Sequence, residues 1–147
     1  MSSTTTASGY AAPASANSSQ DAFALIGRIL LAALFVPAGF GKIAGFAGVV
    51  GYISSVGLPL PQLGAVIAIV VELGLGLLLL AGYKTRIVSI VMAVFTVATA
   101  VIFHNYWGMP ADKAYVNQLM FFKNIAIAGG LLAFASFGAG RFSIDKR

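Results

Sequence analysis

The sequence contains no cysteine and a single histidine, His104, among its 147 residues. Without cysteine, the chain by itself forms no disulfide, no thiolate metal site and no iron–sulfur cluster. One histidine also excludes a bis-histidine haem within one chain. A lone histidine is more often an interfacial hydrogen-bonding group than a metal ligand, so we expect no metal site.

Charge is also scarce. Charged residues make up 9% of the chain and apolar residues 59%, whereas a soluble domain carries about a quarter charged residues. The polar side chains are too few to cover a soluble fold, so the lipid bilayer must cover the remainder. The formal net charge is +5, but the basic residues form no stripe, and we expect no nucleic-acid partner.

Four continuous apolar runs predict transmembrane helices. They lie at about residues 22–41, 62–82, 87–103 and 118–137. About twenty residues, rising ~1.5 Å each, cross a hydrocarbon core of ~30 Å. The glycine-rich segment 43–61 is less hydrophobic, and its central dozen residues predict a short interfacial or re-entrant helix. The predicted fold class is an all-α membrane protein, a four-transmembrane-helix bundle with a short interfacial helix between the first two spans.

The chain divides into a tail and one domain. Residues 1–20 are rich in Ser, Thr and Ala and predict a disordered polar tail. Residues 21–147 form the predicted transmembrane domain, and Asp21 is a candidate helix cap at its start. More Lys and Arg lie on the side of the two termini than on the other side, so the positive-inside rule predicts that both termini are cytoplasmic.

Five ionisable side chains are candidate functional residues. Arg28, Glu72 and Lys123 lie well inside the predicted spans, while Lys42 and His104 lie at span ends. Each charge within a span costs about 2.5–3.5 kcal/mol on insertion scales, so such residues usually face the bundle interior. We therefore predict an interior polar network with Glu72 as its anion.

Small residues share a helical face with each of these groups. Lys123, for example, aligns with Ala126, Gly130 and Ala133. Small residues allow helices to approach closely, so we expect all four faces to point inward. Three roles remain open for the network: a structural clamp, a pocket for a small molecule or quinone headgroup, and a path for a solute or proton.

Short motifs also occur along the chain in a fixed order. They are Arg28, Gly39-Phe40-Gly41-Lys42, Val56-Gly57-Leu58-Pro59, Glu72-Leu73-Gly74, His104-Asn105-Tyr106-Trp107, Phe122-Lys123-Asn124, Gly129-Gly130-Leu131-Leu132 and Gly140-Arg141-Phe142-Ser143-Ile144-Asp145. This ordered set resembles the DoxX family of small bacterial membrane proteins over nearly all of the chain after the tail. The resemblance implies four helices in the bacterial cell (inner) membrane.

The resemblance also implies a function. Better-described relatives are linked to a thiosulfate:quinone oxidoreductase and to membrane oxidoreductase assemblies. We therefore expect a membrane subunit of an oxidoreductase system, with oxidoreductase partner subunits and quinone as a candidate cofactor; catalysis by the chain and its oligomeric state stay open. The alternatives are a small-solute or proton transporter or exporter subunit, and a purely structural membrane scaffold.

Overall fold

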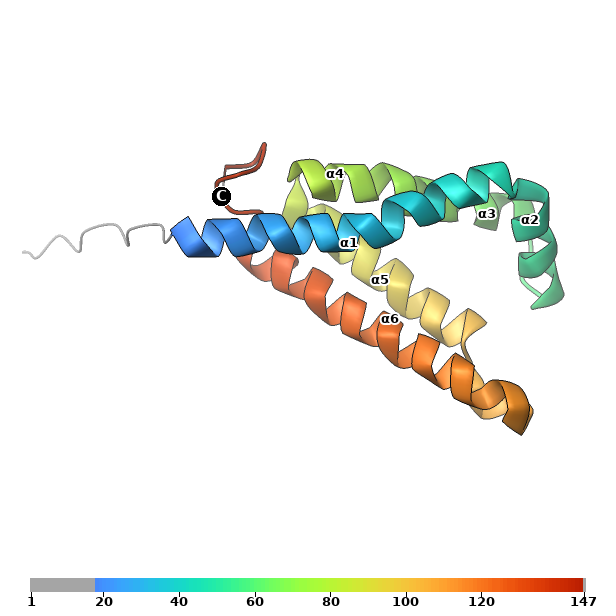
Figure 1. Ribbon diagram of the computed structural model, residues 1–147. Coiled ribbons are helices and arrows are strands. Elements are labelled where there is room, and N and C mark those ends of the chain that lie inside the picture. The colour runs from blue at the N-terminus through green and yellow to red at the C-terminus, as the bar shows by residue number, and fades with distance from the viewer. Residues whose placement is uncertain (1–17, 147) are drawn as a thin grey trace, which may run out of the picture.

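The computed structural model describes residues 18–146, and every regular element in this range is helical. The second span is built from three contiguous segments, the middle one a π-helix. In chain order the elements are α1 (Ser18–Ala44), α2 (Phe46–Ser55), α3 (Pro61–Ile69), the π-helix η1 (Val70–Leu75), α4 (Gly76–Ala81), α5 (Thr85–Phe103), the 3₁₀ turn η2 (Tyr106–Gly108) and α6 (Ala111–Phe137) (Figure 1).

The predicted fold class is confirmed. Four helical stretches of the described chain are long and apolar enough to cross a membrane, and the short apolar helix α2 separates the first two. The helices run further than predicted, most of all at the starts of α1 and α6. α1 begins at Ser18, inside the predicted tail, and residues 1–17 of that tail lie outside the described residues. α6 begins at Ala111, so part of the predicted 104–117 connection is helical.

The four spans form two pairs. α1 packs along the second span, and α5 packs along α6. The two pairs meet near the beginning of α1 and diverge toward the opposite end, where α2 and η2 lie (Figure 1). We call these the closed end and the open end. Apolar side chains from both pairs, including Phe35, Leu79, Met92 and Leu131, form the buried core.

The π-helix lies at a close approach between α1 and the second span. A Cβ atom on Gly39 would lie 2.7 Å from both the backbone N and the Cβ of Leu73, so only glycine fits there. Along the second span each buried residue follows the last by three positions, except that Gly76 follows Val71 by five. A π turn contains more residues than an α turn, so the residues that face the core are spaced more widely here. The wider turn also sets the orientation of η1 against α1.

The C-terminal residues 138–146, which we call the clasp, close the bundle at its closed end. The backbone N–H groups of Ile144 and Asp145 donate to the carbonyls of Ala81 (3.1 Å) and Gly82 (2.9 Å). The Asp145 carboxylate accepts the N–H groups of Lys84 (2.9 Å) and Thr85 (2.8 Å). A residue 60 positions away therefore supplies the N-terminal cap of α5.

Asp21 also holds the clasp rather than capping α1 as expected. It lies within the first turn of α1, and its Oδ1 accepts the backbone N–H of Arg141 at 2.8 Å. Near this contact Gly140 has a φ of +77°, and a Cβ there would lie 3.0 Å from that of Ala24. The clasp thus tethers the start of α1 to the end of the chain.

Candidate functional site

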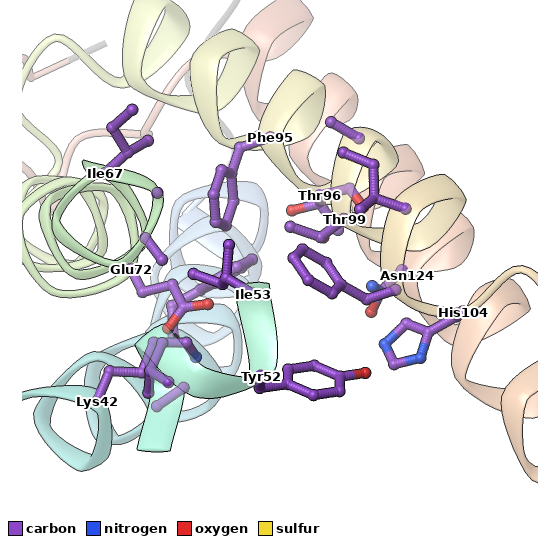
Figure 2. Close-up of a pocket in the computed structure, with 18 of the residues that line it drawn as sticks. Lys42, Tyr52, Ile53, Ile67, Glu72, Phe95, Thr96, Thr99, His104 and Asn124 are labelled. Atoms are coloured by element: carbon purple, nitrogen blue, oxygen red, sulfur yellow. Dashed lines mark hydrogen bonds and ion pairs between the residues drawn. The ribbon is translucent and has the colours of Figure 1, made fainter. Parts of the chain in front are cut away.

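A cavity of about 440 Å³ lies between the two helix pairs toward the open end (Figure 2). Its walls come from α1, α2, the second span, α5 and α6. Small residues, including Ala38, Gly64 and Ala68, line the side formed by the first two spans, and they leave space that larger side chains would fill. Aromatic rings, Phe35 and Phe95 among them, give the cavity apolar walls.

An ion pair lies on one wall of this cavity. Lys42, in the last turn of α1, donates from Nζ to Oε2 of Glu72 at 2.6 Å. The Glu72 side chain is 12% exposed and that of Lys42 29%. Glu72 lies in the π-helix, a distortion that occurs frequently at functional sites. The close contact at Gly39 brings α1 near enough to the π-helix for the pair to form.

Polar groups from α2 and α5 lie near the mouth of the cavity. His104 follows the last turn of α5, and its Nδ1 lies 3.3 Å from Oδ1 of Asn117. Tyr52 of α2 stacks on Phe103 with ring centroids 5.5 Å apart. Figure 2 shows the Tyr52 hydroxyl pointing toward the His104 ring. Hydrogen-bonding groups thus gather at the side of the cavity nearest the open end.

α6 contributes two further polar side chains. Asn124 and Lys123 both line the cavity, with Asn124 half-buried and Lys123 exposed at its rim. The ammonium of Lys123 lies 3.3 Å from Sδ of Met120. Within residues 18–146 no carboxylate lies within 4.0 Å of it, and Glu72 is paired with Lys42 instead. An ion pair between Lys123 and Glu72, the simplest form of the predicted network, is therefore not formed.

The structure gathers four of the five candidate residues around one cavity and separates the fifth. Lys42, Glu72, His104 and Lys123 line the cavity. Arg28 lies at the closed end, fully buried, and donates to the carbonyls of Leu80 at 2.6 Å and of Phe142. Its observed contacts are with the second span and the clasp rather than with Glu72.

The expectation that all four small-residue faces point inward is wrong for α6. The faces of Arg28, Glu72 and His104 are largely buried, but Gly130 and its neighbours along the Lys123 face are exposed. A Cβ on Gly130 would meet nothing within 4 Å. α6 instead turns Ala128 and Leu131 into the core, because these side chains fill the space against α5 that glycine would leave empty.

Two features of the site were not predicted. Tyr52 lies in the segment predicted as a short helix, and no periodic pattern there indicated that its ring would face a cavity. The π-helix at Glu72 was also missed, since its signal, the interval of five between buried residues, is visible only once burial is known. Across residues 18–146, no three His, Cys, Asp or Glu side chains gather in a way that would hold a metal ion.

Together these features define a class of protein: a four-span membrane protein with an internal cavity whose largely apolar walls carry one ion pair and a separate group of hydrogen-bonding side chains. The sequence model of the DoxX family matches residues 23–105. This is more than half of the chain, and the chain belongs to the DoxX family.

Two bacterial relatives cover most of the chain. Inner membrane protein YphA of Escherichia coli (strain K12) is 42% identical over 123 residues, which are 84% of this chain and 88% of that protein. Inner membrane protein YqjF of the same organism is 42% identical over 127 residues, or 86% and 92%. With the four apolar helices, these relatives establish a multi-pass inner-membrane protein.

A more distant relative is eukaryotic. ER-derived vesicles protein ERV29 of Saccharomyces cerevisiae is 33% identical over 66 residues, covering 45% of this chain and 21% of that protein. No solved structure matches the chain.

Proposed function

We propose that this protein is a ligand-binding membrane subunit of an oxidoreductase system, and that its cavity receives the headgroup of a membrane quinone. The observation that carries the proposal is the cavity itself, which combines apolar walls with hydrogen-bonding groups at one side. Its volume of about 440 Å³ falls within the range of about 300–1,000 Å³ typical of small-molecule sites.

The residues around the cavity suit the two parts of such a headgroup. A quinone ring is flat and apolar on both faces, so the ring of Phe95 offers a matching surface. Its carbonyl oxygens accept hydrogen bonds, and Lys123, His104 and Tyr52 carry groups that donate them. An oxidoreductase partner subunit would exchange electrons with the bound ring, since the chain contains no cysteine.

Glu72 is the group through which this proposal is best tested. We expect quinone to co-purify stoichiometrically with the wild-type protein from mild detergent, as measured by mass spectrometry of the extracted lipids. Glu72→Gln removes the charge that holds Lys42 in place and should lower the quinone content while the fold is retained. Asp112→Asn makes the same chemical change in the first turn of α6, outside the cavity, and should leave the content unchanged.

Absence of bound quinone would distinguish between the alternative functions. If neither wild-type protein nor Asp112→Asn contains quinone, and neither takes it up when quinone is added, the proposal is refuted. The Lys42–Glu72 pair would then serve as a structural clamp. A solute or proton transporter would be indicated instead if reconstituted vesicles showed flux that Glu72→Gln abolished.

The proposal also includes an orientation, with the closed end and both termini in the cytoplasm. Besides the buried Arg28, four basic residues of the described chain lie at the closed end, in the α4–α5 turn, the first turn of α5 and the clasp: Lys84, Arg86, Arg141 and Lys146. Lys42 and Lys113 lie toward the open end (Figure 1). This asymmetry matches the positive-inside rule.

Single introduced cysteines test this orientation cleanly, because the chain has none of its own. Ala111→Cys at the open end should react with an impermeant maleimide on a preparation of spheroplasts. Tyr83→Cys at the closed end should react only after the membrane is permeabilised. Neither change alters the number of basic residues, and the reverse labelling pattern would overturn the orientation.

A further inference from the structure

We propose that the cavity selects a ligand with an acidic head, a single negative charge shared between two oxygens on an apolar body, and that Lys123 is the residue that pairs with it. The inference rests on the proposed function for the location of the site and adds the chemical class of its ligand. Its basis is the balance of charges around the cavity.

Three formally charged side chains line the cavity, two lysines and one glutamate. Lys42 and Glu72 neutralise each other, since Nζ and Oε2 are 2.6 Å apart. This leaves the positive charge of Lys123 uncompensated. Its one polar contact in the described chain is the thioether of Met120 at 3.3 Å, and a thioether is only a weak acceptor.

The position of Lys123 within a membrane span also makes its charge unfavourable. It belongs to the predicted fourth span, five residues inside its start at Gln118, and on the exposed rim of the cavity. A lysine among lipid tails is unfavourable unless it reaches an anion or water. An acidic head in the cavity would supply the missing anion, whereas a neutral head would leave the charge unbalanced.

The neighbouring donors favour a head with two oxygens. Asn124 follows Lys123 on α6 and lines the same cavity, and His104, at the end of α5, lies near Asn124 on the same side of the cavity (Figure 2). One oxygen of the head would pair with the Lys123 ammonium, while the other would accept a hydrogen bond from the Asn124 amide or the His104 ring. The apolar body would lie against Phe95 and Ile127.

Two sources of this chemistry exist in a membrane. One is a hydroxyquinone, whose ring hydroxyl is acidic because its negative charge is shared with a ring carbonyl. The other is a fatty acid, whose carboxylate also shares a single negative charge between two oxygens, here on one carbon. Matched probes distinguish them: a hydroxynaphthoquinone and a methylnaphthoquinone with the same undecyl tail, and hexadecanoic acid and its methyl ester.

Binding would be measured on the full chain in nanodiscs of phosphatidylcholine, with empty discs as the blank. Quenching of Trp107, the single tryptophan, reports the naphthoquinones, and isotope-labelled hexadecanoic acid and its methyl ester, counted on the re-isolated discs, report the other two probes directly. Wild-type protein should bind the hydroxynaphthoquinone about tenfold or more tightly than the methylnaphthoquinone, because a hydrogen bond to a charged group contributes this much.

Three variants assign the preference to Lys123. Lys123→Met should abolish the preference for the acidic probe, and Lys123→Arg should retain it. Lys113→Met removes a lysine from the same helix, outside the cavity, and should also retain it. A preference that survives in Lys123→Met would overturn the proposal, and so would equal affinities in the wild-type protein.

The remaining outcomes separate this inference from the proposed function. If the two naphthoquinones bind equally well, the charge selectivity is wrong and the quinone site stands. If only hexadecanoic acid binds, and binds better than its ester, the selectivity stands and the quinone function is wrong. If no probe binds above the empty discs, both are wrong.

Discussion

Replacing Arg28 by methionine should destabilise the closed end of the bundle more than any other single change of a basic residue there. The Arg28 side chain is fully buried, and its two terminal nitrogens donate to carbonyls in separate segments, Leu80 at the end of α4 and Phe142 in the clasp. Methionine would fill much of the space but would leave both carbonyls without a donor.

The magnitude follows from two opposing contributions. Each hydrogen bond from a charged donor stabilises the fold by about 1.5–3 kcal/mol, and the cation lies near the negative end of α4, which adds up to about 1 kcal/mol. Against this, burying a guanidinium costs several kcal/mol, and its Nε has no partner within the described residues. We expect a net loss of about 2–4 kcal/mol, typical of the loss of a buried polar network.

Thermal unfolding in mild detergent measures this loss. A domain of this length should melt about 5–15 °C lower, at ~2–4 °C for each kcal/mol. Arg28→Lys keeps the positive charge but loses the second donor group of the guanidinium. Its melting temperature should lie between those of the wild-type protein and Arg28→Met. Arg86→Met is the matched control, because Arg86 is exposed and donates to the carbonyl of Ser136 at 2.8 Å. A melting temperature of Arg28→Met equal to that of the wild-type protein would refute the reasoning.

Three further predictions concern other contacts of the fold. Asp145→Ala removes the remote cap of α5 and should cost about 1 kcal/mol, measured by denaturant titration in detergent; an unchanged midpoint would contradict the capping role. Gly39→Ala should cost about 1–3 kcal/mol, because its methyl group overlaps Leu73; an equally stable variant would show that α1 can move away from the π-helix without loss. Lys42→Met should cost about 1–3 kcal/mol, because it leaves the carboxylate of Glu72, whose side chain is 12% exposed, without its partner. The double variant with Glu72→Gln should recover part of this loss; an equally unstable double variant would mean that the ion pair is not the cause.

The positions of the helices could be predicted closely, and for a simple physical reason. Within a hydrocarbon layer each backbone polar group must be satisfied inside its own segment, so a long apolar run forms a helix whatever surrounds it. The second and third spans, expected at 62–82 and 87–103, are observed at Pro61–Ala81 and from Thr85 to Phe103. The errors occur at helix ends, where polar residues outside the apolar run also form helical turns.

The partners of the charged side chains could not be predicted in the same way. Periodicity gives the face of a helix on which a residue lies, but not the rotation of that helix against its neighbours. For the face of Lys123 the inward prediction failed, because Ala128 and Leu131 pack better against α5. Arg28 and Lys42 lie on nearly the same face of α1, yet their partners differ. Arg28 donates to carbonyls at the closed end, whereas Lys42 pairs with Glu72 in the π-helix.

The membrane environment, the number of spans and the small set of residues able to carry charge inside them all follow from the amino-acid sequence alone. Hydrophobic length and the cost of burying charge are local properties, so they can be read along the chain. Only the tertiary structure decided that Lys42 pairs with Glu72, that Asp145 caps α5 from 60 residues away and that a cavity opens between the helix pairs. These features depend on distances between segments remote in sequence, which packing of all four spans sets at once.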